Sequence, residues 1–270
     1  MLKVMSIMAH QDDFEFTAGG LFAHLRQKYG ADVELKIIVT NRGASGHHQM
    51  GIEETFRRRE QEAANSAKLI GADYACLTGL DGNHLPGLVF IDNNTLGGLW
   101  NAIRYFEPDF IFCPPVVTDP LAGIHMDHYN TAWAIRMIAY QLSVPHAYPT
   151  MNGAMKLRVP TPIIINVDDS YAGEGGFDFS IDLTDDIYEH KIKMALCHQS
   201  QVFEWLPWNF NGVETTITEA EFRESFRNRH STINKRYAND DRVPREYFRM
   251  TRWGKIASPE EVLSKMQLNV

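Results

Sequence analysis

The stretch LKVMSIMAHQDDFEFTAGG, residues 2–20, joins an apolar run to a cluster of acids. Residues 2–9 have the apolar character of a strand that is buried on both faces. The run stops at a histidine and is followed by three carboxylates: His10, Asp12, Asp13 and Glu15. Carboxylates this close together repel one another unless a positive charge lies among them. The stretch therefore predicts a first strand whose carboxyl end opens into a charged site.

Apolar runs alternate with amphipathic stretches along the first two-thirds of the chain. Strands are predicted at residues 2–9, 33–40, 74–79, 86–91 and 109–115, and helices at residues 18–30, 53–69, 96–106 and 129–142. This alternation predicts an α/β fold with a Rossmann-like, mostly parallel sheet and helices on both faces. Ligands of such sheets bind beyond the carboxyl ends of the strands. The loops after residues 2–9 and 109–115 are therefore expected to share one pocket.

Beyond residue 150, two more strands are predicted at residues 162–167 and 177–183, together with a helix that begins near Thr184. No linker and no internal repeat separates this part from the rest. We therefore expect a single domain over residues 1–270. It would consist of a Rossmann-like core at residues 1–150, which carries the site, and a C-terminal extension at residues 151–270 packed on it.

Length and composition narrow the class of protein. A chain of 270 residues suits one large α/β domain. Its net charge of −8 argues against a nucleic acid or an anionic membrane as partner. No apolar run approaches the ~20 residues of a membrane span, and the N-terminal run lacks a signal-peptide cleavage site. The cysteines are few and far apart (Cys76, Cys113 and Cys197), so we expect no disulfide framework and a cytoplasmic protein.

Two separate clusters carry side chains that bind metals. His10 and Asp13 lie three positions apart at the mouth of the first predicted strand. The stretch GIHMDHYN, residues 123–130, supplies His125, Asp127 and His128 after a later strand. Imidazole and carboxylate are ligands that zinc accepts at about 2.0–2.2 Å, and three protein ligands with one open position are typical of catalytic zinc sites. We therefore expect one Zn²⁺ per chain.

Two alternatives remain open at this point. Adjacent acids after a first strand, Asp12 and Asp13, also suit a magnesium-dependent phosphoacceptor or phosphatase. That reading requires a further aspartate and a lysine near the sheet, and it leaves the histidines without a role. The other alternative is a metal-independent sugar- or nucleotide-binding domain on the same fold. The first strand is not followed by G-x-G-x-x-G, which counts against this alternative.

Four segments resemble motifs of the PIG-L/LmbE-like zinc N-deacetylases. AHQDDFEFTAGG (residues 9–20) resembles the A-H-x-D-D-x-E signature with its following glycines, and HMDH (residues 125–128) resembles H-x-D-H. RRREQEAANSAKLIGA (residues 57–72) resembles a helix of the family, and KIKMALCHQSQ (residues 191–201) resembles its late K-x-x-A-x-x-x-H-x-S-Q element. The resemblance implies a zinc-dependent hydrolase that removes the acetyl group from an N-acetylglucosamine-type sugar or conjugate, and a possible homo-oligomer.

The resemblance also implies roles for single residues. Three of them would bind zinc: His10, Asp13 and His128. Asp12 would be the general base for attack by water. A protonated His125 would face the developing oxyanion, and Asp127 would orient His125. These roles fit the chemistry, because zinc lowers the pKa of bound water from 15.7 to about 7 and polarises an amide carbonyl.

The sequence departs from the family pattern at two positions. Gln11 stands where proline is usual, and Gly123 stands where many members have tyrosine. We therefore assign no tyrosine to the catalytic set. Glu15 is expected to orient His10 or a neighbouring backbone group, or to serve as an acid at the N-terminus of a helix.

Substrate contacts are harder to predict. Three consecutive arginines, Arg57 to Arg59, cannot share one helix face, and Arg58 is predicted to contact the sugar or a phosphate. Trp205 and Trp208 can form an apolar platform for a sugar ring, although such pairs are more often core residues. The roles of three further residues stay open: His47, His48 and His198. The expected partner is a small N-acetyl amino sugar or its conjugate.

Overall fold

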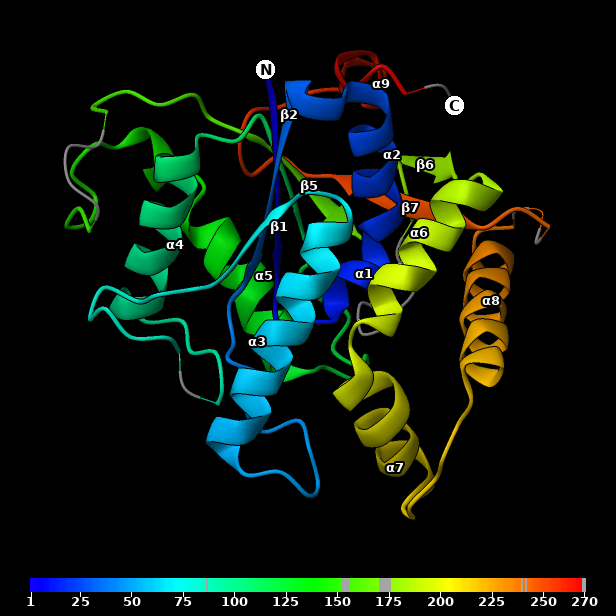
Figure 1. Cartoon of the computed structure of the whole chain (residues 1–270). Coiled ribbons are helices and arrows are strands. Elements are labelled where there is room, and N and C mark those ends of the chain that lie inside the picture. The colour runs from blue at the N-terminus through cyan, green and yellow to red at the C-terminus, as the bar shows by residue number, and fades with distance from the viewer. Residues whose placement is uncertain (86, 152–155, 170–175, 239, 241, 269–270) are drawn as a thin grey trace.

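The computed structural model describes residues 1–85, 87–151, 156–169, 176–238, 240 and 242–268 (Figure 1). Its strands are β1 (Leu2–Met8), β2 (Val33–Val39), β3 (Asp73–Cys76), β4 (Phe110–Cys113), β5 (Ile163–Val167), β6 (Phe179–Asp182) and β7 (Arg245–Met250). Within the described residues they form one sheet in the order β3-β2-β1-β4-β5-β7-β6. The strands from β3 to β5 are parallel, and β7 is antiparallel to both of its neighbours. The predicted α/β fold with a mostly parallel sheet is confirmed.

Helices cover both faces of this sheet (Figure 1). They are α1 (Asp13–Thr17), α2 (Gly19–Tyr29), α3 (Ile52–Leu69), α4 (Asn93–Phe106), α5 (Met126–Ile138), α6 (Asp185–Leu196), α7 (Leu206–Asn211), α8 (Glu219–Arg236) and α9 (Pro259–Met266). Helices α4 and α5 pack together on one side, and α2 and α6 pack together on the other. In the described part of the chain, no helix is long and apolar enough to cross a membrane.

Strand β1 is buried on both faces, as its apolar run predicts. Val4 and Met8 belong to the core under α2 and α6, whereas Met5 and Ile7 belong to the core under α4 and α5. This division follows from the alternation of side chains along a strand. Because both cores close on the same strand, the position of its carboxyl end is fixed by packing from both sides.

The register of the central strands decides which loops meet. β1 and β2 pair from Leu2 and Val33 to Met8 and Val39, and the pairing continues to the Asn41 N–H, which donates to the Ala9 carbonyl at 2.9 Å. β4 pairs with the other edge of β1, and β5 pairs with β4. The loops that follow β2, β1, β4 and β5 therefore emerge side by side at one end of the sheet.

The prediction of a strand at residues 86–91 is wrong for residues 87–91, which form a loop; residue 86 lies outside the described residues. Side chains of the site take the hydrogen bonds that a ladder would need. The Val89 N–H donates to Asp127 Oδ1 at 2.7 Å, and the Gly87 carbonyl accepts from Asn41 Nδ2 at 2.8 Å. Val89 is fully buried in the core, which explains the strand-like apolar sequence.

The second half of the chain adds strands to the same sheet. The predicted strands and the helix near Thr184 correspond to β5, β6 and α6, whereas α8, β7 and α9 were not predicted. β7 lies between β5 and β6 and carries a buried charge, Glu246, which is 3% exposed. Glu246 Oε1 lies 2.6 Å from Lys191 Nζ and its carboxylate accepts from the N–H groups of Gly20 and Leu21, at the start of α2. Because a charged residue occupies a core position, β7 lacks the apolar pattern by which a strand is predicted from sequence.

We predict that Glu246→Ala lowers the free energy of unfolding by about 3–5 kcal/mol, because it leaves the Lys191 ammonium buried without its partner. Asp73→Asn is the control, since Asp73 pairs with Lys36 at the surface, where such pairs contribute ~1 kcal/mol or less. Denaturation of both variants in urea measures the difference. Equal losses in the two variants would contradict a structural role for the buried pair.

Candidate active site

Loops at the carboxyl ends of four adjacent strands carry charged side chains into one cavity. The cavity has a volume of about 940 Å³. Its polar end is lined by residues that follow β1, β2, β4 and β5: His10, Asp12, Asp13, Asn41, His125, Asp127, His128 and Asp169. The two clusters that were expected to share a pocket therefore lie together in the structure.

In both clusters, the start of a helix determines where the histidine side chains lie. After β1 the chain turns so that the backbone N–H of His10 donates to Asp13 Oδ2 at 2.8 Å, and α1 begins at Asp13. His125 is the N-cap of α5, where its Nδ1 accepts from the Asp127 N–H at 3.3 Å. His128 follows one helical turn later, so both histidines point to the same side.

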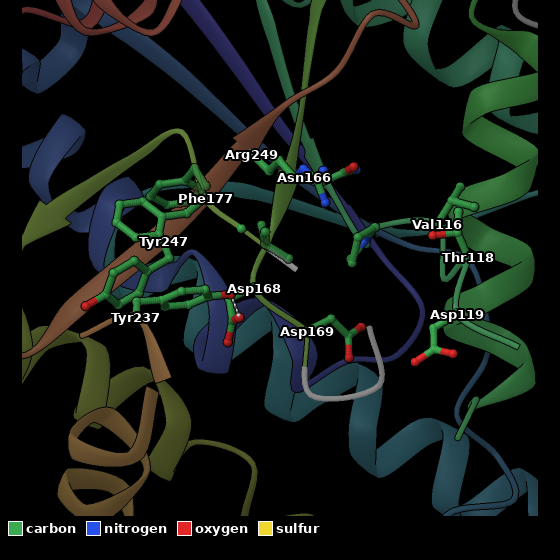
Figure 2. A pocket seen from close by; sticks show the side chains of 14 residues that line it. Val116, Thr118, Asp119, Asn166, Asp168, Asp169, Phe177, Tyr237, Tyr247 and Arg249 are labelled. Atoms are coloured by element: carbon green, nitrogen blue, oxygen red, sulfur yellow. Dashed lines mark hydrogen bonds between the residues drawn. The ribbon is translucent and has the colours of Figure 1, made fainter. Parts of the chain in front are cut away.

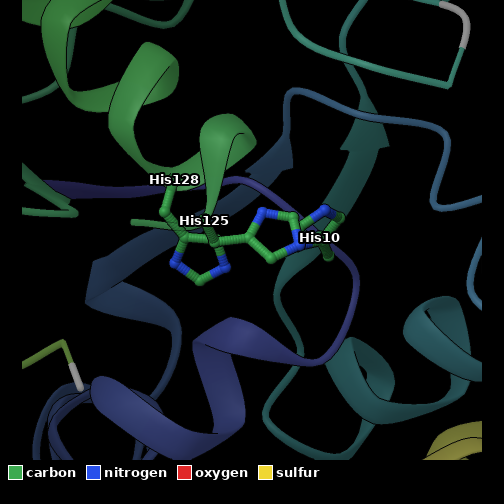
Figure 3. Close-up of side chains that lie close together, drawn as sticks. All are labelled: His10, His125 and His128. Carbon is green, nitrogen blue, oxygen red and sulfur yellow. The ribbon is translucent and has the colours of Figure 1, made fainter. Parts of the chain in front are cut away.

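Three imidazoles meet at the centre of the site (Figure 3). The ring centroids of His10 and His125 are 4.8 Å apart, those of His10 and His128 are 5.2 Å apart, and those of His125 and His128 are 5.1 Å apart. One nitrogen from each ring lies within 4.8 Å of the others. This spacing permits a metal ion to contact more than one ring.

Two of these histidines are held by carboxylates that leave one ring nitrogen facing Asp13. His10 Nε2 lies 2.9 Å from Asp127 Oδ2, and its Nδ1 lies 3.5 Å from Asp13 Oδ2. His128 Nδ1 lies 2.7 Å from Asp169 Oδ2, and its Nε2 lies 3.3 Å from Asp13 Oδ1. A carboxylate can only accept, so the outer nitrogen of each ring carries a proton, whether a proton or a metal ion occupies the inner nitrogen. The inner nitrogens converge on Asp13, as in the carboxylate–histidine–metal arrangements of metal sites.

The electrostatics of the site favour positive charge at this point. Burial lowers the pKa of His128, but Asp13 and Asp169 outweigh it and raise the pKa to about 11. Burial likewise opposes protonation of His10, while Asp127 and Asp13 raise its pKa above the ordinary value. Asp13 is held well below its usual pKa, despite burial, chiefly by the charge on His128. The carboxylates therefore draw protons, or a cation, onto the inner nitrogens.

His125 differs from the other two histidines. Burial lowers its pKa, and the charges of His10 and His128 lower it further, so the ring is neutral at pH 7. Because Nδ1 accepts from the Asp127 N–H, the neutral ring carries its proton on Nε2. The lowered pKa favours a neutral hydrogen-bond donor at this position, whereas the resemblance implies a protonated ring.

Asp127 contacts a different partner from the one that the resemblance implied. Its carboxylate lies against His10, accepts from Asn41 Nδ2 at 2.8 Å and accepts from the Val89 N–H at 2.7 Å. The backbone N–H of Asp127, and not this carboxylate, makes the hydrogen bond to His125 described above. Asp127 therefore orients His10 and ties the loop at residues 87–91 to the site.

Asp12 faces the cavity beside a buried arginine. Arg59 Nη2 donates to Asp12 Oδ1 at 2.8 Å, and its Nη1 donates to the Gly43 carbonyl at 3.1 Å. Gly43 has φ +62°, and a Cβ there would lie 2.1 Å from Gln11 Oε1. Gln11 is itself buried and donates to the Arg42 carbonyl at 2.8 Å. The loop after β2 and the side chain at position 11 therefore set the position of the Asp12–Arg59 pair.

The structure places Arg58, the residue predicted to contact the sugar or a phosphate, in ion pairs with two glutamates. Arg58 is not among the cavity-lining residues; its Nη1 lies 2.8 Å from Glu204 Oε2, and its Nε lies 3.2 Å from Glu62 Oε1. Arg57 is exposed, and Arg59, only 3% exposed, is the member that reaches the cavity. The three arginines do point to different sides of α3, but the sequence does not reveal which side faces the site.

Glu15 lies away from His10 in the structure. Its carboxylate is buried, accepts from the Ser66 hydroxyl and lies 3.0 Å from His198 Nε2. These residues belong to α1, α3 and the segment that follows α6. Glu15 and His198 therefore join three elements behind the site. Of the two roles expected for Glu15, an acid in the first turn of a helix is the one that the structure has, since Glu15 lies in the first turn of α1.

The paired histidines and tryptophans form a stack at the side of the cavity. The rings of His48 and Trp208 are parallel within 5° with centroids 4.5 Å apart, and His47 Nε2 lies 3.0 Å from Glu204 Oε2. Of these residues, only Trp205 is among those that line the described cavity. The stack holds the loop after β2 against the π-helical turn η3 (Ser200–Trp205) and α7.

Asp169, which holds His128, is a site residue that the sequence analysis missed. It belongs to an acidic pair that directly follows β5, as Asp12 and Asp13 follow β1 at a distance of a few residues. Figure 2 shows that Asp168 lies against Tyr237, with the Tyr237 hydroxyl 2.6 Å from Asp168 Oδ1, while Asp169 points away from it. A smaller cavity of about 110 Å³ lies beside the two acids. The rule that ligand sites follow strand ends would have found Asp169.

Known proteins share both the sequence pattern and the fold. The family model PIG-L, described as GlcNAc-PI de-N-acetylase, matches residues 5–139, which are 135 of the 270 residues. No curated protein sequence matches the chain. Similar solved structures include the N,N′-diacetylchitobiose deacetylase from Pyrococcus horikoshii, with 20% identity, a TM-score of 0.68, and coverage of 92% of this chain and 83% of that chain.

Two other neighbours carry different descriptions. A 4-carboxy-2-hydroxymuconate hydratase from Pseudomonas putida has 18% identity and a TM-score of 0.62, with 96% of this chain and 99% of that chain covered. A zinc-inhibited form of teicoplanin deacetylase has 10% identity and a TM-score of 0.57, with 93% and 99% covered. At these identities the structures share the fold alone. The family match spans half of the chain and includes both clusters of the site, and the chain belongs to the PIG-L family.

Proposed function

We propose that this protein is a zinc-dependent hydrolase that removes the acetyl group from an N-acetylglucosamine-type sugar or sugar conjugate. The observation that carries the proposal is the convergence of the inner nitrogens of His10 and His128 on Asp13. Membership of the PIG-L family and the deacetylases among the structural neighbours support the reaction type. One structural neighbour is described as a hydratase, and a shared fold alone does not determine the reaction.

His10 Nδ1, His128 Nε2 and the Asp13 carboxylate would hold the ion, one Zn²⁺ per chain. His125 is a poorer ligand than these, because a neutral ring that accepts at Nδ1 carries its proton on Nε2 and has no free lone pair. Two imidazoles and one carboxylate, with a position left open, are a donor set that catalytic zinc sites use. When bound, the ion would supply a Lewis acid that polarises the acetyl carbonyl and activates water at neutral pH.

Asp12 is the proposed general base. It accepts a proton from the attacking water, whose oxygen forms a bond to the acetyl carbon, and passes the proton to the leaving nitrogen as the C–N bond breaks. The products are acetate and a free amine. Arg59 holds the carboxylate through Oδ1, so that Asp12 faces the cavity as a base and stays out of the ligand set.

His125 is the proposed donor to the developing oxyanion. Its ring lies beside those of His10 and His128, and its Nδ1 accepts a backbone hydrogen bond at the start of α5, which leaves Nε2–H as the donor. A donor that is held in place before the reaction stabilises the tetrahedral intermediate without reorganisation. The neutral ring would also avoid adding a positive charge beside the ion that His10 and His128 would hold.

The two alternative functions fit the geometry less well. A magnesium phosphoacceptor prefers oxygen ligands, whereas three imidazoles lie at the centre of this site. Asp12, the acid that such a site would use, is paired with Arg59. A metal-independent binding domain leaves unexplained why buried acids converge on two histidines.

Chelation should abolish acetate release from N-acetylglucosamine-type substrates, and zinc should restore it while magnesium should not. The reason is that the inner donors are imidazole and carboxylate, a set that suits zinc better than magnesium. Metal analysis of the purified chain, combined with an acetate assay, measures both. Retention of full activity in metal-free protein would exclude the zinc hydrolase.

Asp12→Asn should lower kcat by about 10²–10⁴-fold, since the amide cannot accept the proton from water. Zinc content should stay at the wild-type value, because Asp12 is not one of the proposed ligands. Steady-state kinetics and metal analysis on the same sample separate the two effects. Wild-type kcat in this variant would place the base elsewhere.

Asp169→Asn and Asp168→Asn form a matched pair of adjacent substitutions. Asp169→Asn should weaken zinc binding by about 10–100-fold, because the contact that orients His128 is lost. Asp168→Asn changes the contact with Tyr237 and should leave zinc affinity unaltered. Competition with a zinc-binding dye measures both affinities. Equal affinities in the two variants would show that Asp169 does not hold a ligand.

A further inference from the structure

Arg229 is a charged side chain in the cavity wall that the proposed reaction does not use. It lies on α8 and is one of two arginines of the described residues that line the cavity, the other being Arg59. Arg59 is paired with Asp12 and with the Gly43 carbonyl. For Arg229, the described part of the chain offers no hydrogen bond and no ion pair, and its Nε is buried without a partner.

The surroundings of Arg229 explain why it stays unpaired. Its guanidinium carbon lies 5.6 Å from the centre of the Phe16 ring, a contact that takes up none of its N–H groups. Burial lowers the pKa of Arg229 and the charges of Asp168 and Asp169 raise it, while guanidinium remains protonated in proteins. Those acids are engaged elsewhere, Asp168 with Tyr237 and Asp169 with His128.

Other arginines of the same helix show the contrast. Arg223 Nη1 lies 2.7 Å from Glu189 Oε2, and Arg236 Nη1 lies 3.2 Å from Asp168 Oδ1. These side chains on α8 are matched by a carboxylate of the protein. A guanidinium that is largely removed from water without such a match is costly, so its retention in a cavity indicates that a ligand supplies the missing acceptor.

The cavity is large enough for a substrate that reaches beyond the acetylated amine. Its volume of about 940 Å³ lies near the upper end of the range for sites that bind small molecules. The walls away from the histidines are largely apolar and include Trp205, Leu206, Phe210 and Phe222. Arg229 is a cation in the wall of this cavity, within electrostatic reach of Asp169 and Asp13 and on a chain whose net charge is −8. It therefore provides a local attraction for an anion, in contrast to the charge of the chain as a whole.

We infer that Arg229 binds an anionic group of the substrate, a phosphate or a carboxylate carried by the sugar or its aglycone. The planar guanidinium presents paired N–H donors that match both groups in a bidentate contact. This inference rests on the proposed function and sharpens it: the preferred substrate is an anionic N-acetyl sugar or conjugate. Phosphate and carboxylate share the chemistry that Arg229 recognises, and substrates of each kind distinguish them.

The test compares acetate release by the zinc-loaded full chain from neutral and anionic substrates. The neutral substrates are N-acetylglucosamine and its methyl glycoside; the anionic ones are its 1-phosphate, its 6-phosphate and a glycoside bearing a carboxylate. We expect kcat/KM for one anionic class to exceed that for the neutral sugars by about 10–100-fold, the range for a hydrogen-bonded charge. The class that shows the preference identifies the group.

The variants assign this preference to Arg229. In Arg229→Met, the ratio of kcat/KM for anionic substrates to kcat/KM for neutral substrates should fall to about one. The loss should appear as a higher KM for the anionic substrate, because the residue binds a part of the substrate that does not react. Arg229→Lys should keep part of the preference, since the charge remains. Arg227→Met, an exposed position on the same helix, is the control and should keep the wild-type ratio. Thermal unfolding of each variant checks that it is folded.

A separate binding experiment keeps this inference distinct from the proposed function. If no N-acetyl sugar yields acetate, the proposed function fails, and calorimetric titration with inorganic phosphate and with acetate still tests Arg229. The inference then requires that the wild-type chain and Arg227→Met bind one of these anions about ten times more tightly, or better, than Arg229→Met does. Equal binding by all three proteins, or equal turnover of neutral and anionic sugars by the wild type, overturns it; Arg229 would then serve only to pack on Phe16.

Discussion

The contact of one carboxylate, Asp13, with two histidines is the interaction on which the site depends. Asp13 reaches the inner nitrogen of His10 and that of His128, and each ring is fixed on its outer side by a further acid. None of these groups would be stable alone in this position, since unpaired charges and unbonded imidazoles are costly when they are largely removed from water. Each requires the others, so the cluster forms as a unit.

The order of the strands in the sheet brings these side chains together. His10 follows β1, and His128 follows β4, the strand that pairs directly with β1. Asp169 follows β5, which pairs with β4, and Asn41 follows β2 on the other side. Because parallel strands end at the same edge of a sheet, residues more than a hundred positions apart arrive within hydrogen-bonding distance. The same arrangement places Asp12 beside Arg59 and outside the ligand set.

The sequence predicted the parts of this arrangement that local patterns encode. The apolar run of β1, the alternation of strands and helices, and the two histidine clusters all lie in short stretches with clear signals. The prediction failed where tertiary contacts overrode the pattern. Residues 87–91 are mostly apolar and Val89 is buried, yet Asp127 and Asn41 take up backbone groups of this loop. β7 was missed because it carries the buried Glu246.

The sequence also does not predict how a helix is rotated or which charges surround a given ring. The choice between Arg58 and Arg59 depends on the rotation of α3 about its axis, which three consecutive arginines do not reveal. The lowered pKa of His125 depends on its burial and on the rings of His10 and His128 beside it, which come from separate parts of the chain. The sequence does not single out Arg229, because its proposed role rests on a feature of the folded chain: the described residues offer its guanidinium no carboxylate partner. Asp169 was available from its place after a predicted strand.

A crystal structure of the zinc-loaded protein, with the ion located by anomalous scattering at the zinc edge, tests the central claim most directly. We expect an ion within about 2.0–2.2 Å of His10 Nδ1, His128 Nε2 and the Asp13 carboxylate, with His125 unbonded to it. An ion held by the three histidines without Asp13, or no ion at this site, would contradict it.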